Sequence, residues 1–394
     1  MANKVIIGLL VFLVVLSCGL GAYSYLLSQQ LHALNEQFLD FQTEQTGQIG
    51  AVSDELKNFR GETMAEIGSL ESDIIGTLAR VGVLEDEVGG FSKSLMNANE
   101  VYQRVSQAVV RVTDGERSIG SGFVFDDKAH VVTAYHVVEQ LSDIYVILPD
   151  GSISTATVAG SCQFSDIAVL TLGDELSVEP LSLADSAAVR IGEPVVTIGS
   201  PFNLTETLTS GVVSQVDRFV EIETDSQNRW VANLIQFDAA ANFGNSGGPL
   251  LNSAGEVLGM IIARVNPERG DGIYYAVSSN KIRRVASAII DQGFFDYPWV
   301  GVGIANLTLE TVYARGLETI NGALVKEVVS GGPAAAAGLQ VDDIIIAIDG
   351  AEVGDVARLT SYMGEHLTPG EPANFTVIRG TALVDISLEV GLRQ

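Results

Sequence analysis

The chain opens with an uncharged apolar run over residues 5–27, directly after Lys4. A membrane-spanning helix needs about 20 such residues, whereas the apolar part of a cleavable signal peptide is about 7–15 residues long. The run therefore predicts an uncleaved transmembrane anchor within residues 1–27. Lys4 is the only positive charge close to it, which places the N-terminus in the cytoplasm and the rest of the chain outside.

A lipoprotein signal is the alternative for this segment. Val15-Leu16-Ser17-Cys18 is similar to a lipobox. Leu16 fits that pattern poorly, and apolar residues continue beyond Cys18. The uncleaved anchor is therefore the favoured interpretation.

Residues 28–100 are polar and acidic, and their apolar residues recur at spacings of three and four. This period is typical of heptads, here with interruptions near residues 45 and 63. The positions are Leu31, Leu34, Phe38, Phe41, Ile49, Val52, Leu56, Phe59, Ile67, Leu70, Ile74, Val81, Leu84, Val88, Phe91 and Leu95. They predict a coiled-coil stalk that oligomerises the protein. A single helical spacer is the alternative, because several glycines interrupt the segment and each weakens a helix by about 1 kcal/mol.

In residues 101–290 the pattern changes to short β-rich runs that are bounded by turn residues. Such runs predict a mainly β domain that folds as a double barrel. Residues 291–298 form a linker to a second globular segment, which covers residues 297–394.

Composition narrows the function. The 394 residues carry 49 acidic and 22 basic side chains, a formal net charge of −27. No basic patch or stripe is visible, which argues against nucleic-acid binding. Cys18 and Cys162 fall in different parts of the chain, so the fold does not depend on disulfides. The sequence contains no metal-ligand cluster and no phosphate-binding loop, and we expect neither a metal nor a cofactor.

The strongest chemical signal is Gly244-Asn245-Ser246-Gly247-Gly248-Pro249. Glycines let the backbone adopt conformations that other residues resist, so Ser246 is expected on an exposed, tight loop. Gly244, Asn245 and Ser246 are then candidates for an oxyanion hole, with the N–H groups of Gly244 and Ser246 converging on one point. Taken alone, the segment is equally compatible with a glycine-rich turn.

A serine nucleophile needs a base and a group that orients the base. His136 lies in the apolar run of residues 131–138, and Asp166 stands at the start of the buried-strand pattern of residues 167–172. The order His, Asp, Ser is that of chymotrypsin-type proteases. The predicted triad is therefore His136 as general base, Asp166 as its orienting group and Ser246 as nucleophile.

These blocks resemble the HtrA/Deg family of serine proteases. The similar segments are residues 119–125 (first-barrel strand), 133–138 (histidine block), 165–170 (aspartate block), 199–202 with 209–214 (an intervening segment) and 235–250 (serine block). Several blocks in the right order are stronger evidence than any single motif. The resemblance implies a chymotrypsin-like double β-barrel over residues 101–290, with His136 and Asp166 from the first barrel and Ser246 from the second.

The same resemblance places the specificity pocket at Ile273, Tyr274 and Tyr275. This stretch is apolar and has no acidic residue, which predicts a preference for small or medium aliphatic side chains at the cleavage site. The chain departs from the family at Tyr274-Tyr275, where Gly-Phe is usual, at Tyr135, where a small residue is usual, and at Phe243, where proline is frequent. None of these departures removes a catalytic atom.

Residues 297–394 resemble the α+β PDZ domain of the family. Trp299-Val300-Gly301-Val302 is similar to its carboxylate-binding loop, and residues 331–339 and 342–350 follow in PDZ order. A PDZ domain adds an extended peptide to a sheet edge and holds the peptide's C-terminal carboxylate with backbone N–H groups. Asp342 stands where the family usually has glycine. A PDZ fold with an occluded groove is the alternative.

One anchor, one protease domain and one PDZ domain look most like the DegS-type members. The resemblance implies a membrane-anchored serine endopeptidase of protein quality control or stress signalling, held in the inner membrane with its domains facing the periplasm. Its partners would be misfolded or unassembled proteins, C-terminal peptides and further copies in a trimer. Peptide binding would either activate the protease or only tether substrate. The non-enzymatic alternative is a catalytically silent chaperone or scaffold, which the departures at Tyr135 and Phe243 leave open.

Overall fold

The computed structural model describes residues 2–44, 60–61, 63–78, 80, 97–116, 118–173, 177–200, 207–222, 229–264 and 272–393. The chain forms two compact units, Met1–Ser92 and Lys93–Gln394.

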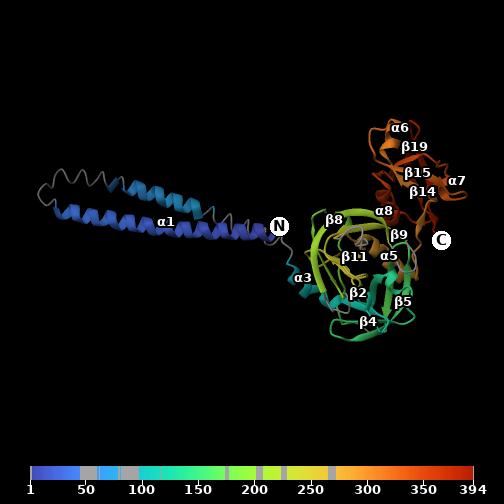
Figure 1. The fold of residues 1–394 in the computed structure, drawn as a ribbon, viewed down its shortest axis with the longest axis horizontal. Helices are drawn as coiled ribbons and strands as arrows, with labels where there is room; N and C mark the ends of the chain where they lie inside the picture. The colour runs from blue at the N-terminus through green and yellow to red at the C-terminus, as the bar shows by residue number, and fades with distance from the viewer. Residues whose placement is uncertain are drawn as a thin grey trace. The chain divides into compact units, whose positions relative to one another are not determined.

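The first unit begins with the long helix α1 (Ala2–Glu44; Figure 1). Within it, Ile7–Ala33 has a mean hydropathy of 2.2 and is long and apolar enough to cross a membrane. Apolar side chains such as Ile7 and Phe12 are exposed, as expected for a segment that has no protein partner to cover it. The predicted N-terminal apolar helix is confirmed. The length and composition of this segment fit a membrane anchor, and they also fit a signal sequence.

The structure describes only part of the predicted stalk over residues 28–100. Residues 28–44 continue α1, and residues 60–61, 63–78 and 80 are also helical. The heptad positions in 45–59 and 81–96 lie outside the described residues. Helical structure is therefore confirmed where it is described, and the continuous coiled coil stays a prediction.

The second unit starts with α3 (Ala98–Val105) and η1 (Ser106–Ala108) and continues into a closed barrel with the strand order β1-β2-β3-β6-β5-β4. Its strands are β1 (Val109–Thr113), β2 (Ser118–Val124), β3 (His130–Ala134), β4 (Ile144–Ile147), β5 (Ile153–Cys162) and β6 (Ile167–Leu172). The short helix α4 (Tyr135–Val138) follows β3 directly. Strand β6 is an almost continuous apolar run and is buried along nearly all its length, which is the pattern of a strand covered on both faces.

A second closed barrel has the strand order β10-β11-β12-β9-β8-β7. Its strands are β7 (Pro194–Gly199), β8 (Thr207–Ile222), β9 (Arg229–Phe237), β10 (Pro249–Leu251), β11 (Val257–Arg264) and β12 (Tyr274–Ser278), and η2 (Ser186–Ala188) precedes them. Helix α5 (Ser279–Gln292) closes the domain. Ser278 caps its N-terminus, and Gly293, with φ 90°, ends it in the left-handed conformation that glycine accommodates.

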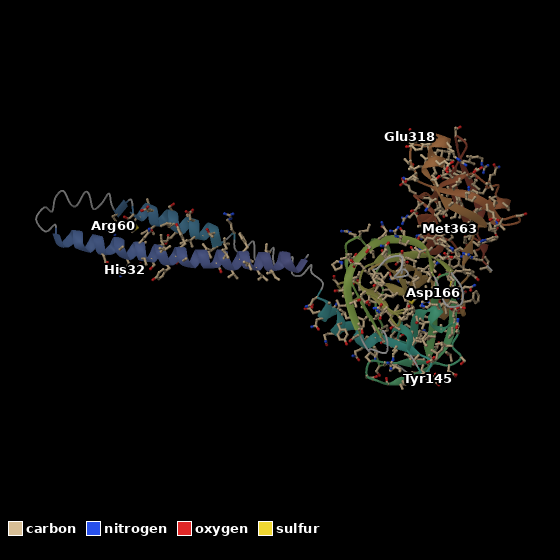
Figure 2. The ribbon with its side chains drawn as sticks, viewed as in Figure 1. His32, Arg60, Tyr145, Asp166, Glu318 and Met363 are labelled. Carbon is tan, nitrogen blue, oxygen red and sulfur yellow. The ribbon has the colours of Figure 1, made fainter. Side chains whose placement is uncertain are left out.

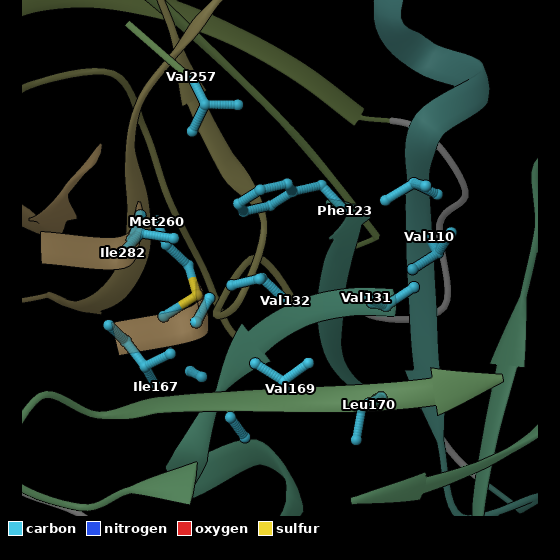
Figure 3. Packing of buried hydrophobic residues seen from close by; sticks show 14 of the residues in the cluster. Val110, Phe123, Val131, Val132, Ile167, Val169, Leu170, Val257, Met260 and Ile282 are labelled. Carbon is cyan, nitrogen blue, oxygen red and sulfur yellow. The ribbon is translucent and has the colours of Figure 1, made fainter. Parts of the chain in front are cut away.

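The two barrels share one apolar core. Phe123 and Val132 of the first barrel, Val257 and Met260 of the second, and Ile282 of α5 are fully buried in the same cluster (Figure 3). Full burial of a side chain of this size stabilises the fold by about 1.5–3 kcal/mol. The common core fixes residues of one barrel relative to those of the other.

The remaining residues form a PDZ fold. A five-strand path β14-β15-β16-β18-β19 carries β17 on β16, and β13 pairs with β20. The elements are β13 (Pro298–Trp299), β14 (Val302–Asn306), α6 (Leu309–Arg315), β15 (Ala323–Val328), α7 (Pro333–Ala336), β16 (Ile344–Ile348), β17 (Ala351–Glu352), α8 (Val356–His366), β18 (Pro372–Arg379), β19 (Ala382–Glu389) and β20 (Gly391–Leu392). The predicted mainly β class is confirmed. The domain limits 101–290 and 297–394 stay predictions.

Helix α8 rests on strands β8 and β9 of the second barrel. The β8–β9 ladder is irregular there, and one residue on each strand has a left-handed backbone: Asp217 with φ 52° and Asn233 with φ 62°. Asp217 pairs with Arg358 of α8, and Asn233 bonds Ser361 through its backbone N–H (3.1 Å) and its side-chain amide (2.7 Å). Bulges bend strands and redirect side chains. Here both irregular positions direct polar side chains to α8.

Lys281 of α5 is buried at this domain contact and is 1% exposed. Its Nζ donates to the carbonyl oxygen of Gly364 (2.5 Å) and lies 4.5 Å from the centre of the Tyr297 ring and 5.4 Å from that of Phe295. Burial disfavours the charged amine and lowers the pKa of Lys281 to about 7.

This lysine predicts a pH-dependent stability. Between pH 7 and 10.5, the ordinary pKa of lysine, the unfolded chain binds a proton that the folded chain does not. The free energy of unfolding should therefore rise with pH across this window, by up to about 1.4 kcal/mol per pH unit. Urea unfolding of the detergent-solubilised full chain at several pH values measures this slope. Lys281→Met should remove it, and equal slopes in the two proteins would contradict the prediction.

Candidate active site

Asp166, which is labelled in Figure 2, binds helix α4 by three hydrogen bonds, and α4 carries His136. Its Oδ2 lies 2.6 Å from Nδ1 of the His136 ring. Its Oδ1 accepts the backbone N–H of His136 (2.9 Å), and its backbone carbonyl accepts that of Tyr135 (3.0 Å). With the proton on Nδ1, the ring donates to the carboxylate and Nε2 is left as the basic nitrogen. The structure thus brings together two of the three predicted triad residues.

Asp166 has the backbone conformation that this arrangement needs. Its φ of 52° lies in the left-handed region, which aspartate and asparagine tolerate better than most residues. The side chain is almost fully buried, whereas that of His136 is 20% exposed. The carboxylate is therefore screened from water, and the imidazole keeps an open side.

The pKa of His136 is raised above the ordinary histidine value. Burial alone lowers it, but the charge of Asp166 and the hydrogen bond to it outweigh that effect. Glu139 adds to the rise and Arg229 opposes it. The site therefore favours an imidazolium ion, the species that a general base becomes when it accepts a proton.

The serine loop is built around a tight turn. The N–H of Asn245 donates to the carbonyl of Asn242 (3.0 Å), and Gly244, third in the turn, has φ 100°. A positive φ at that position is the mark of a type II turn, which needs glycine. The N–H of Asn245 is used within the turn, so the candidate donors narrow to those of Gly244 and Ser246.

The backbone N–H groups of Gly244 and Ser246 are unusual because they make no hydrogen bond among the described residues. Gly244 is buried and Ser246 is half-buried. Buried N–H groups are nearly always paired. Two unpaired donors two residues apart beside a serine hydroxyl match the requirement for binding an oxyanion.

The first barrel holds the serine loop next to α4. The N–H of Ser121 in β2 donates to the carbonyl of Ser246 (2.8 Å). A Cβ on Gly120 would lie 2.7 Å from the Val137 side chain and 2.8 Å from the Ser246 carbonyl oxygen, so only glycine fits between them. Among the described residues no hydrogen bond joins the Ser246 hydroxyl to the His136 ring. Such bonds often tighten only when substrate is bound.

Sequence reasoning missed the role of Ser121. Its side chain is fully buried, its Oγ donates to the carbonyl of Gly244 (2.6 Å) and accepts the N–H of Ser200 (3.1 Å). Thr133 in turn donates to the Ser121 carbonyl (2.7 Å). The only signal was a small polar residue between two glycines in an otherwise apolar strand.

The residues predicted to line the specificity pocket point in different directions. Tyr274 is buried in the second barrel, with its ring centre 5.7 Å from that of Phe237. Ile273 and Tyr275 are half-buried. Strand β11, an apolar run that follows the serine block, supports the serine loop more directly, because Ile261 exchanges hydrogen bonds with Gly247 (2.7 Å) and Gly248 (2.9 Å).

The predicted carboxylate-binding loop is a bend between two short strands. Gly301 has φ 79°, and a Cβ there would lie 3.2 Å from the Trp299 ring. Val300 is buried, and its carbonyl accepts the N–H of Ala334 (2.9 Å). Val302 begins β14, the terminal strand of the sheet path.

No cluster of three or more His, Cys, Asp or Glu side chains suited to a metal occurs among the described residues. The remaining described histidines have other surroundings. His130 pairs with Asp126 (2.6 Å), and the His366 ring lies 4.6 Å from that of Tyr362.

Residues 120–260 match the trypsin-like peptidase domain family, and residues 298–390 match the PDZ domain family. Over 335 residues the chain is 31% identical to the serine protease Do-like HtrA of Bacillus subtilis (strain 168), covering 82% of this chain and 72% of that protein. The chain belongs to the HtrA/Deg family of serine proteases. It is a serine-type endopeptidase of that family.

Other relatives agree with this assignment. The HtrA-family chain is 34% identical over 275 residues to the periplasmic serine endoprotease DegP of Escherichia coli (strain K12), covering 69% of this chain and 57% of DegP. Among solved structures, HtrA-type protease AlgW with tripeptide matches with a TM-score of 0.64 and 31% identity, over 76% of this chain and 98% of AlgW. The serine endoprotease from Yersinia pestis matches with a TM-score of 0.55 and 27% identity, over 76% of this chain and 99% of that one.

The raised pKa of His136 predicts the acidic limb of the pH–rate profile. His136 must be neutral to accept a proton, so kcat/KM should fall as the pH drops through a value above 6.5, the ordinary histidine pKa. Peptide hydrolysis between pH 5 and pH 9 measures this. Asp166→Asn removes the interactions that raise the pKa, so the limb should move to lower pH while kcat falls by about 10³–10⁴-fold. An acidic limb at or below pH 6.5 in the parent protein would contradict the assignment of this limb to His136 with a raised pKa.

Ser121→Ala should slow catalysis, because it removes the hydroxyl that holds Gly244. We expect a loss of about 10-fold or more in kcat, below the 10²–10³-fold cost of losing an oxyanion donor outright. Ser154→Ala is the matched control, since Ser154 is also buried in the first barrel and its hydroxyl also donates to a carbonyl. Equal rates in the two variants would show that Ser121 has no part in shaping the loop.

Proposed function

We propose that this protein is a membrane-anchored endopeptidase of extracytoplasmic protein quality control or stress signalling, and that it works through an acyl-enzyme on Ser246. The observation that carries the catalytic part is the Asp166–His136 pair, together with the backbone N–H groups of Gly244 and Ser246, which make no hydrogen bond among the described residues. A serine loop that served only as a turn would have no use for such donors.

In the proposed mechanism Nε2 of His136 takes the proton of the Ser246 hydroxyl as Oγ attacks the scissile carbonyl. The N–H groups of Gly244 and Ser246 bind the oxyanion that forms. His136 then gives the proton to the leaving amine, and the acyl-enzyme remains. Water repeats the sequence, with His136 as base, and releases the acid and the free serine. Throughout, Asp166 holds the imidazole tautomer and stabilises its charged form.

The proposed cleavage preference is for small or medium aliphatic side chains. Tyr274 occupies buried space in the second barrel next to the ring of Phe237, and the stretch from Ile273 to Tyr275 carries no charge. A pocket lined in this way has nothing to pair with a basic or acidic side chain.

For the PDZ domain we propose binding of C-terminal peptides that regulate the protease. Strand β14 ends the sheet path, so an extended peptide could be added at its outer edge. Two similar structures are described as AlgW with decapeptide and with tripeptide. Helix α8 contacts both β14 and the strands β8 and β9 of the protease domain, which offers a physical link. Regulation requires that the peptide binds the active state more tightly than the resting one.

The proposed location is the inner membrane, with the protease and PDZ domains facing the periplasm. Support comes from the apolar segment Ile7–Ala33 and from relatives named as periplasmic endoproteases. Substrates would be misfolded or unassembled proteins, and the protein would act as a homo-oligomer.

The deciding experiment is hydrolysis of unfolded β-casein by the full chain in detergent micelles, with and without a library of C-terminal peptides. Ser246→Ala is the control for contaminating proteases. We expect cleavage that depends on Ser246 and rises when an activating peptide is added. Equal cleavage with and without peptide would show that the PDZ domain only tethers substrate and does not activate the protease.

Labelling by a fluorophosphonate separates the enzyme from the scaffold. The reagent should modify Ser246 in the parent protein and leave Ser246→Ala unmodified. A parent protein that neither cleaves casein nor takes the label would contradict the proposed mechanism and favour a chaperone.

A further inference from the structure

Three side chains with complementary chemistry meet beside the short helix that carries His136. Arg229, the first residue of β9, pairs with Glu139, the C-terminal cap of α4, and both side chains are only 8% exposed. The guanidinium carbon of Arg229 also lies 4.9 Å from the centre of the Tyr135 ring. Arginine suits such a place, because its planar group can bond a carboxylate and stack on an aromatic ring together.

Helix α4 needs to be held from outside. It is four residues long, and a single helical turn is unstable without tertiary contacts. Tyr135 and Glu139 are its first residue and its cap, joined by the bond from the Glu139 N–H to the Tyr135 carbonyl (2.9 Å). Arg229 contacts both of these residues, so its two contacts lie on either side of His136 along the chain.

The contact crosses from one barrel to the other. Glu139 and Tyr135 belong to the first barrel, which also supplies Asp166. Arg229 begins β9 of the second barrel, and the far end of β9 leads into the loop of Ser246. Asp166 holds the N-terminal side of α4 within its own barrel, whereas Arg229 joins α4 to the strand that precedes the nucleophile.

We propose that Arg229 is a positioning residue for catalysis: by binding Glu139 and stacking on Tyr135 it fixes α4 to the second barrel and so sets the His136 ring against the Ser246 hydroxyl. The inference rests on the proposed roles of His136 and Ser246 and adds a residue to them. It also gives a reason for Tyr135, one of the positions at which this chain departs from the pattern of its family.

The charges around His136 allow an experiment to distinguish a positioning role of Arg229 from a role in folding alone. The groups that act on its pKa are Asp166 and Glu139, which raise it, and Arg229, which lowers it. Removing Arg229 should therefore shift the acidic limb of the rate profile to higher pH, and removing the charge of Glu139 should shift it to lower pH. Loss of folding would not move the two limbs in opposite directions.

The test compares Arg229→Met, Arg229→Lys, Glu139→Gln and the double variant Arg229→Met/Glu139→Gln in the full chain in detergent. For each, kcat, KM and the acidic limb are measured with one peptide substrate. Arg229→Met should lower kcat by about 10–100-fold, the cost of a small misplacement of reacting groups, with KM little changed. Arg229→Lys keeps the charge but loses the planar guanidinium and its stacking on Tyr135, so kcat should fall while the limb stays in place.

The double variant separates position from charge. Its two opposing effects on the His136 pKa cancel in sign, so the limb should return towards that of the parent, while kcat stays low because the clamp is absent. It also removes the two opposite charges of the pair together, so it guards against a variant that fails to fold because one of them is left buried without the other. Asp126→Asn is the matched control for Glu139→Gln: it removes a carboxylate of the same barrel that pairs with His130 and does not act on His136.

The melting temperature of each variant gives the fraction of folded protein at the assay temperature, and every rate is corrected for that fraction. The proposal is overturned if kcat per folded site is unchanged in Arg229→Met, or if both single variants shift the limb in the same direction. Either result leaves Ser246-dependent hydrolysis intact. Failure of the proposed function would instead appear in the parent protein, as hydrolysis that survives Ser246→Ala.

Discussion

The carboxylate of Asp166 is the group on which the proposed catalytic arrangement depends. One oxygen accepts the backbone N–H of His136, and the other holds its ring, so a single buried side chain fixes both the helix and the imidazole. The backbone carbonyl of the same residue holds Tyr135. These contacts are possible because Asp166 accepts a left-handed backbone at the start of a strand that is buried along nearly all its length. The orientation of the base is therefore a consequence of how β6 begins.

The loop of Ser246, the proposed nucleophile, is positioned differently: two glycines without side chains let the backbones of the two barrels come into contact. A Cβ on Gly120 would meet the Ser246 carbonyl, and one on Gly247 would lie 2.1 Å from the carbonyl oxygen of Ser121. The backbones of the two barrels thus approach each other more closely than any other residue allows. Ser121 uses this proximity, since its N–H and its hydroxyl bind two carbonyls of the serine loop. In the part of the chain that the structure describes, this packing of backbone on backbone leaves the N–H of Gly244 without an acceptor.

The sequence predicted the fold class and the His136–Asp166 pair because both depend on local patterns. Alternating apolar residues and turn residues indicate the barrels, and short motifs in a fixed order indicate the site. It did not predict Ser121 or Arg229, whose partners lie 123 and 90 residues away along the chain. Contacts of that kind depend on how two closed barrels pack, which no local period records. For the same reason the sequence did not predict that Tyr274 packs against Phe237 of β9; its place in the specificity pocket stays a prediction. Asn245 was grouped with the oxyanion donors because spacing cannot show that a turn uses its N–H.

Strand β9 joins these separate arrangements. Its first residue, Arg229, bonds the cap of the His136 helix. In its middle, Asn233 leaves the regular ladder with φ 62° and bonds Ser361 of the PDZ helix α8, and beyond its end the chain reaches Ser246. A shift of α8 would therefore act on a strand that bears on the base and leads to the nucleophile. Such continuity becomes regulation only if the strand has two arrangements that a peptide distinguishes. The left-handed conformation of Asn233 is accompanied by two hydrogen bonds to Ser361, so this residue is a point at which α8 bears directly on β9.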